Sequence, residues 1–181
     1  MSKVYLGMTL SIDGFVNDRK GKFDKLFASF EPNEELAVML KNTGAVVMGR
    51  NTFEEADDTD SYADSYEFQV PLFVLTERPP TKHPKENDKL TVTFVTDGIE
   101  SAIKQARIAA KGKDVAVMGA NVGRQLLKAN LADELQITLA PILLGKGLRL
   151  FEHLEDIEIH LEKQRTIETK QQVKIWYKVI R

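Results

Sequence analysis

The chain has 181 residues, of which 43% are hydrophobic and 29% charged, and its formal net charge is -2 at pH 7. These values are ordinary for a globular protein, and a slightly negative charge argues against binding to nucleic-acid phosphates. Because the sequence contains no cysteine, disulfides, thiolate metal sites and cysteine nucleophiles are excluded. The first residues lack the apolar core of a signal peptide, and no run of about 18 apolar residues predicts a membrane helix. We therefore expect one cytoplasmic domain over residues 1–181, without nucleic-acid or membrane partners.

The first half of the chain predicts two strands with a helix between them. Residues 3–10, KVYLGMTL, are rich in residues that favour strands, and the Asp13-Gly14 pair that follows indicates a turn. Residues 31–43 place a proline and acidic residues ahead of apolar positions at helical spacing, which predicts a helix. Residues 45–49, AVVMG, form a short apolar run typical of a strand that is covered on both faces.

Three later runs resemble that strand, at residues 71–76, 90–96 and 115–119. A helical stripe of apolar residues occupies 99–111, between the last two, and another helix is expected at about 121–130. Strands that alternate with helices predict an α/β fold with a mostly parallel central sheet and helices on both faces.

The last part of the chain predicts antiparallel structure at the sheet edge. Residues 133–144 contain a further strand, and residues 157–180 read as two long strands around a polar turn near Thr169-Lys170. The acidic segment 55–69 and the proline-rich segment 77–89 are expected to be solvated connections.

Two of the predicted strands end in the same three letters, Val-Met-Gly, at residues 47–49 and 117–119. In an open α/β sheet, ligands bind beyond the carboxyl ends of the strands. Glycine allows close approach of a ligand, and the N-terminus of the next helix favours an anion such as phosphate. Asn51 or Thr52 is the expected cap of the first of these helices, with a glutamate three residues on, and Asn121 is the expected cap of the second.

Arg50 directly follows the first of these glycines. A cation beside the positive end of a helix is unfavourable unless a negative partner arrives, so the position favours a phosphate ligand. The alternative is that Gly49 and Gly119 serve only as turns and that Arg50 lies in solvent.

Three segments resemble the NADPH-binding segments of dihydrofolate reductases. VVMGRNTFEE, residues 46–55, is similar to a strand-to-helix segment whose arginine and threonine hold cofactor phosphates. FVLTERPP, residues 73–80, is similar to the next strand end, near the adenosine 2'-phosphate, and VAVMGANVGRQLL, residues 115–127, to the glycine segment at the pyrophosphate. The resemblance implies a cofactor site made of Gly49, Arg50, Thr52, Thr76, Arg78, Gly119, Ala120, Asn121 and Val122.

Two further segments, MTLSIDGF at 8–15 and LADELQITLAPILLGKGLRLF at 131–151, are more similar to the reductase domain of riboflavin biosynthesis, a relative of dihydrofolate reductase. Together the five segments imply a dihydrofolate reductase-like fold with an antiparallel C-terminal hairpin. They imply an NADPH-dependent oxidoreductase acting on a pyrimidine- or pterin-type heterocycle, like 5-amino-6-(5-phosphoribosylamino)uracil reductase or dihydrofolate reductase. By the same resemblance a homodimer is expected. The alternative is a non-catalytic nucleotide-binding protein that keeps the cofactor site without turnover.

Hydride transfer to a C=N or C=O carbon also requires a proton, so a carboxyl group near the nicotinamide is expected. Asp13 is one candidate, although it is also an ordinary residue of an Asp-Gly turn. Glu35 is the other, because alignment on Leu36-Ala37 gives it the place of the substrate-binding carboxylate of dihydrofolate reductases. Alignment backward from Gly49 gives that place to an alanine, and Glu35 is then an exposed acid of the first helical turn. The three histidines form no ligand pattern, so no metal is expected.

Overall fold

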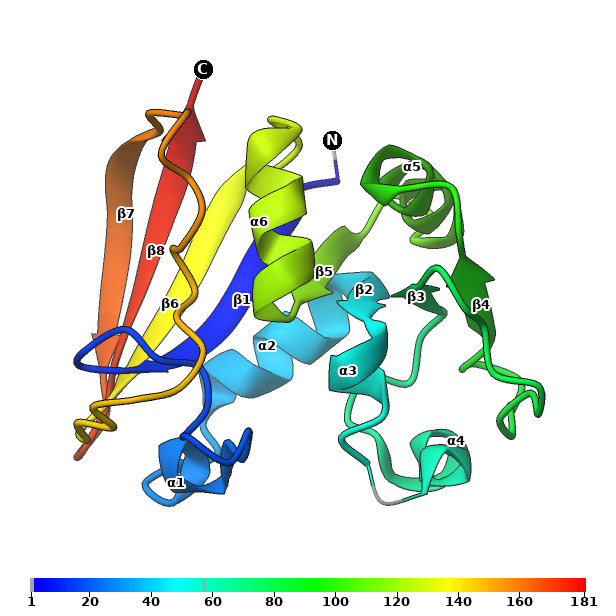
Figure 1. The fold of residues 1–181 in the computed structure, drawn as a ribbon, viewed down its shortest axis with the longest axis horizontal. Helices are drawn as coiled ribbons and strands as arrows, with labels where there is room; N and C mark the ends of the chain where they lie inside the picture. The colour runs from blue at the N-terminus through cyan, green and yellow to red at the C-terminus, as the bar shows by residue number, and fades with distance from the viewer. Residues whose placement is uncertain (1, 57) are drawn as a thin grey trace.

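The computed structural model describes residues 2–56 and 58–181, and its centre is an eight-stranded sheet in the order β4-β3-β2-β5-β1-β6-β8-β7. The strands up to β6 are parallel, β8 runs antiparallel to β6, and β7 runs antiparallel to β8. Figure 1 shows β7 and β8 along one edge of the sheet and β4 along the other. The predicted fold class is therefore confirmed. The strands are β1 (Val4–Ser11), β2 (Thr43–Gly49), β3 (Leu72–Leu75), β4 (Val92–Val95), β5 (Asp114–Met118), β6 (Glu134–Ala140), β7 (His160–Glu168) and β8 (Val173–Ile180).

Helices cover both faces of the sheet and create two hydrophobic cores. In β2, Ala45 and Val47 belong to the core beneath α5 and α6, whereas Val46 and Met48 belong to the core beneath α2, α3 and α4. This alternation explains why every residue of the strand from Ala45 to Met48 is apolar. Among the described residues, no helix is long and apolar enough to cross a membrane. The helices are α1 (Asp24–Phe27), α2 (Glu34–Asn42), α3 (Arg50–Phe53), the 3-10 turn η1 (Thr59–Ser61), α4 (Tyr62–Ser65), α5 (Ile99–Ala109) and α6 (Ala120–Lys128).

The predicted caps after the two Val-Met-Gly ends are wrong. Gly49 and Gly119 themselves occupy the N-cap positions of α3 and α6, and no side chain caps either helix. The strands lead directly into the helices, so Asn51, Thr52 and Asn121 already lie inside the first turn. The amides of these first turns are consequently left for other partners.

The loop after β1 packs against the loop after β6. Leu148 N donates to Asn17 Oδ1 over 2.8 Å, and Val16 N donates to Leu148 O over 2.8 Å. A Cβ added to Gly147 would lie 1.9 Å from Asn17 O, so this close approach requires glycine. The two segments that resemble riboflavin-pathway reductases are also neighbours in space, because β1 pairs with β6 and Phe15 bridges to Arg149.

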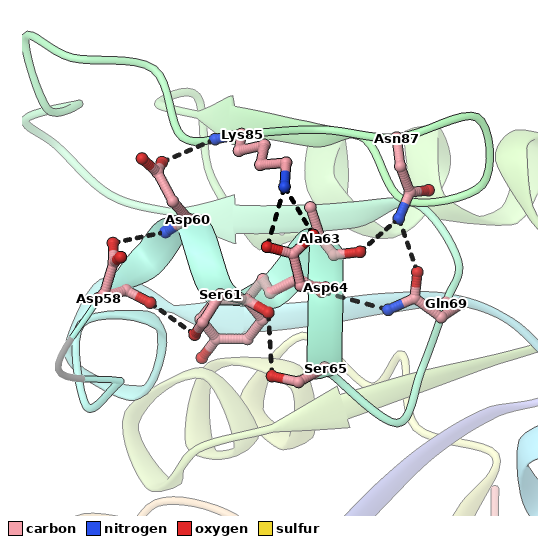
Figure 2. Close-up of polar contacts among 10 residues, drawn as sticks. Asp58, Asp60, Ser61, Ala63, Asp64, Ser65, Gln69, Lys85 and Asn87 are labelled. Carbon is pink, nitrogen blue, oxygen red and sulfur yellow. Dashed lines mark hydrogen bonds and ion pairs between the residues drawn. The ribbon is translucent and has the colours of Figure 1, made fainter.

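The acidic and proline-rich connections bind one another instead of lying separately in solvent (Figure 2). Lys85 Nζ lies 2.6 Å from Asp64 Oδ1, and the amide of Lys85 donates to Asp60 Oδ1 over 2.8 Å. Asn87 Nδ2 donates both to Ala63 O, over 2.6 Å, and to Gln69 Oε1, over 2.8 Å. Residue 57 of the acidic segment lies outside the described residues. These contacts tie the β3–β4 connection to the α4 region.

Candidate active site

The two Val-Met-Gly ends lie side by side in the same register. β2 pairs with β5, with Val47 opposite Val117 and Met48 opposite Met118, so both glycines reach the same edge of the sheet. Gly119 has φ +100, and a Cβ placed on it would lie 2.6 Å from Thr52 Oγ1. The edge therefore combines two strand ends without side chains and the uncapped start of α6. The amide of Gly119 donates to Met8 Sδ over 3.2 Å, whereas no side chain caps the first turn of α6, whose amides are available to a ligand.

Arg50 is already engaged by other parts of the protein. Its Nε lies 2.7 Å from Glu54 Oε1, and its Nη1 donates to Arg78 O over 2.7 Å. Thr76 Oγ1 accepts from the amide of Arg78 over 3.1 Å. The structure thus brings together the predicted ligands at the ends of β2 and β3. The sequence predicts that Arg50 needs a negatively charged ligand. In the structure, Glu54 already neutralises part of its charge.

A cavity of about 870 Å³ opens beside this glycine edge and runs over the face covered by α2. It reaches from the start of α3 and α6, across β1 and β6, to β8 and the segment around α1. The lining combines apolar and aromatic side chains with a few polar groups, as in most small-molecule sites. It includes Gly7, Met8, Thr9, Phe23, Phe27, Phe30, Glu35, Leu36, Met39, Thr52, Gly119, Gln136, Thr138, Gln172 and Lys174.

Glu35 lines this cavity from α2, whereas Ala37 is exposed and is absent from the lining. The carboxylate accepts two hydrogen bonds from the Arg165 guanidinium, over 3.0 and 2.5 Å, and only 15% of the side chain is exposed. Arg165 in turn stacks on Trp176, with its central carbon 3.9 Å from the ring centroid. Glu35 is therefore a fixed carboxylate on the cavity wall. The role of Glu35 in substrate binding stays a prediction, and its place on the cavity wall is compatible with it.

A second cavity of about 230 Å³ adjoins the first near the N-terminal ends of β1, β2 and β5. The two cavities share Tyr5, Glu35, Met39 and Gln136. Tyr5 OH lies 2.8 Å from Thr43 Oγ1, and burial raises the pKa of Tyr5 to about 12. The phenol therefore stays protonated at neutral pH and is a hydrogen-bonding group of both cavity linings.

Asp13 lies in the turn after β1, as expected, but its carboxylate is bound by the loop after β6. Its Oδ1 accepts from the amide of Leu144 over 3.1 Å and its Oδ2 from the amide of Gly145 over 2.7 Å, and it does not line the larger cavity. Hydrogen bonding by Ser11 and by these two amides outweighs desolvation and lowers the pKa of Asp13 to about 2. A carboxylate that is ionised and bound to a loop is a poor proton donor. The geometry supports a structural role for Asp13, and its predicted catalytic role gains no support from this position.

Comparison with known families shows to which protein family the chain belongs. A model of the RibD C-terminal domain family matches residues 2–175. The chain belongs to this family. Uncharacterized protein YwjB of Bacillus subtilis (strain 168) is 24% identical over 177 residues, covering 97% of each chain.

Two solved structures show the same fold. A putative riboflavin biosynthesis protein from Shewanella sp. PV-4 aligns over 99% of both chains, with 24% identity and a TM-score of 0.79. Dihydrofolate reductase from Enterococcus faecalis, solved as a complex with NADP(H), aligns over 98% of this chain and 96% of its own, with 18% identity and a TM-score of 0.58. The predicted family and fold are therefore confirmed.

In this member of the RibD C-terminal domain family, Lys174 is a site residue that the sequence analysis missed. It lies on β8 opposite Thr138 of β6, and both residues line the larger cavity. The ammonium lies 4.7 Å from the Trp176 ring centroid. Burial lowers the pKa of Lys174, while the charge of Glu35 opposes the shift. Its signal in the sequence is the two-residue spacing to Trp176, which puts both side chains on one face of the strand.

Proposed function

We propose that this protein is an NADPH-dependent reductase that transfers hydride to a small heterocycle bound in the 870 Å³ cavity. The observation that carries the proposal is the direct connection between the glycine edge and that cavity, because Gly119, Ala120 and Thr52 line both. The family relationship and the likeness to a dihydrofolate reductase that binds NADP(H) support the same cofactor.

The residues at the edge fit a dinucleotide phosphate. A side chain at Gly119 would collide with Thr52, and the first amides of α6 have no side-chain cap. Gly49, Gly119, Ala120, Asn121 and Val122 would hold the pyrophosphate through their main chain. Arg50 and Thr52 would add charged and hydroxyl contacts. Thr76 and Arg78 would meet the 2'-phosphate that distinguishes NADPH from NADH.

When bound, NADPH supplies the hydride, and the protein must orient the substrate and provide the proton. Glu35 is held by Arg165 and can accept hydrogen bonds from N–H groups of a heterocycle. Lys174 Nζ carries a proton into the same cavity, and the burial that lowers its pKa also makes that proton easier to give up. We assign orientation of the substrate to Glu35 and proton donation to Lys174.

The test begins with the cofactor and continues with turnover. NADPH is titrated by fluorescence, and absorbance of the nicotinamide is then followed with a panel of pterins and pyrimidines. The proposal expects saturable NADPH binding, weaker NADH binding and substrate-dependent loss of absorbance. Cofactor binding with no turnover on any compound would favour a non-catalytic nucleotide-binding protein. Absence of cofactor binding would contradict both functions.

A further inference from the structure

The smaller cavity, of about 230 Å³, has a polar floor that is almost completely buried. Exposed side chains from other segments form its rim, so the space is reached from the surface. Burying a polar group costs free energy unless the group finds a hydrogen-bond partner. The floor consists of five side chains that are each at most 9% exposed, Tyr5, Thr43, Glu134, Gln136 and Trp176.

The hydroxyl group of Tyr5 is oriented as an acceptor. Thr43 Oγ1 donates its only proton to Met39 O over 2.8 Å. The 2.8 Å contact between Tyr5 OH and Thr43 Oγ1 must therefore use the proton of Tyr5. The phenol oxygen has no second proton to donate, but it can still accept a hydrogen bond from a ligand.

The side-chain amide of Gln136 also offers an acceptor. Its Nε2 donates to Glu134 Oε1 over 2.8 Å, whereas no donor of residues 2–56 and 58–181 reaches its Oε1. Because Gln136 lines both cavities and this oxygen is not a buried atom, the oxygen is accessible to a ligand. Glu134 Oε2 accepts from Lys3 Nζ over 3.2 Å at the rim. The lining therefore already binds one ammonium group of the protein.

One carboxylate of the lining has no ionic partner. Two ion pairs, Glu35 with Arg165 and Glu134 with Lys3, balance four of the five charges. The fifth is Asp114, whose Oδ1 accepts from the main-chain amide of Lys3 over 2.9 Å. Within the described residues, no basic side chain lies within 4.0 Å of Asp114. The lining keeps one negative charge, since Lys174 lines only the larger cavity.

The unpaired carboxylate lies close to the Tyr5 hydroxyl. Burial is the main cause of the raised pKa of Tyr5, and the charges of Asp114 and Glu134 add to it. Strand pairing agrees, because Tyr5 lies opposite Glu134 and Thr43 opposite Asp114. Tyr5, Asp114 and Gln136 thus present open acceptors in one small space. Such a set favours a ligand that carries several N–H donors and a positive charge.

We propose that the smaller cavity is a second binding site, for a small primary ammonium compound. An ammonium group has three donors and no acceptor, which matches the oxygens of Tyr5, Asp114 and Gln136. The hydrocarbon part of the ligand would contact Val38 and the ring of Trp176. The inference goes beyond the proposed reductase function and does not depend on it.

The only tryptophan of the chain provides the readout. Trp176 lines the smaller cavity and not the larger one. Tryptophan fluorescence and calorimetry follow titrations with n-butylamine, which is protonated at neutral pH as lysine is, with tetramethylammonium, which has no N–H group, and with n-butanol, which has no charge. We expect saturable binding of butylammonium, about tenfold or more tighter than that of either control. Equal binding of butylammonium and tetramethylammonium, or no saturable signal by either method, would overturn the inference.

Variants remove the acceptors one at a time. Tyr5→Phe keeps the buried ring, and Asp114→Asn keeps the oxygen that accepts from the amide of Lys3. Each should weaken butylammonium binding by about tenfold. Asp88→Asn, at an exposed position outside both linings, is the matched control and should leave the affinity unchanged. Thermal unfolding establishes that each variant is folded. Unchanged affinity in both Tyr5→Phe and Asp114→Asn would contradict the proposed site.

Discussion

Glu35 and Arg165 form a two-bond ion pair between α2 and β7, although they are 130 residues apart in the sequence. The pair fixes the carboxylate at the junction of the two cavities, and the stacking of Arg165 on Trp176 fixes the guanidinium. This wall of the larger cavity thus depends on Arg165, which is not itself in the lining of that cavity.

Arg165→Ala should loosen Glu35 and raise the substrate KM, while the Kd for NADPH stays unchanged. The partly exposed pair and its stacking on Trp176 together contribute only about 1 kcal/mol to stability, so the variant should fold. Steady-state kinetics and urea unfolding measure the two effects. Arg165→Lys keeps the charge but loses the planar fork, so its KM should lie between those of the parent and the alanine variant. An unchanged KM in both variants would show that substrate binding does not depend on the pairing of Glu35 with Arg165.

Arg50 and Glu54 should have opposite effects on cofactor affinity. Arg50→Ala should weaken NADPH binding by about tenfold to hundredfold, the scale of a charge-assisted phosphate contact. Glu54→Gln should strengthen binding, because it removes the carboxylate that now competes for Arg50. Fluorescence titration of both variants checks this pair of effects. Arg50 is not a cofactor ligand if its replacement leaves the NADPH affinity unchanged.

Gly119→Ala should destabilise the fold for two separable reasons. Its φ of +100 is strained for alanine, at roughly 1–3 kcal/mol, and its Cβ would also meet Thr52 Oγ1. Gly112→Ala is the matched control, since Gly112 has φ +88 and no atom within 4 Å of an added Cβ. Urea unfolding should show a larger loss at Gly119 than at Gly112, and adding Thr52→Ala should recover the difference. Equal losses of unfolding free energy would mean that the close approach to Thr52 does not affect stability.

Lys174→Met should lower kcat by about a hundredfold or more if the ammonium donates the proton, with little change in NADPH affinity. In the parent protein the rate should fall as the pH rises through the pKa of Lys174, which burial holds below 10.5. This alkaline limb should vanish in the variant. A pH–rate profile of both proteins provides the measurement. Persistence of the same limb in Lys174→Met would assign proton donation to another group.

Asp13→Asn should lower the stability of the fold and leave kcat unchanged. The folded pKa of about 2 lies below the ordinary value of 3.8, so ionised Asp13 stabilises the fold above that value. This contribution is lost as the pH falls from 3.8 towards 2. In the variant, this part of the pH dependence of stability should be absent. Thermal unfolding between pH 2 and pH 7 tests the stability effect. A large loss of kcat at neutral pH would instead restore Asp13 as a catalytic residue.

The glycine edge could be predicted from sequence because its signals are local. Each Val-Met-Gly run joins an apolar strand to a helix, and parallel strands bring such ends to one edge. The caps at Asn51 and Asn121 were mispredicted, since capping preferences assume a residue between strand and helix that this chain does not have. Local patterns do not show how abruptly one element follows another.

The cavity wall around Glu35 and Lys174 was harder to predict because it is assembled from segments that are distant in the sequence. Glu35 could be proposed only through a resemblance, with two competing alignments. Arg165 and Lys174 belong to an edge hairpin, where basic residues ordinarily face solvent. Their places follow from the registers of β7 with β8 and of β8 with β6, which depend on tertiary pairing.

The hairpin formed by β7 and β8 also gives the site an order of assembly. Residues 49 to 122 supply the glycine edge, whereas Arg165, Lys174 and Trp176 are among the last to be synthesised. A nascent chain can therefore build the glycine edge from segments made earlier. The cavity wall that includes Lys174 is complete only when β8 pairs with β6. If the proposed function holds, the nascent chain would gain its nucleotide site before its substrate site.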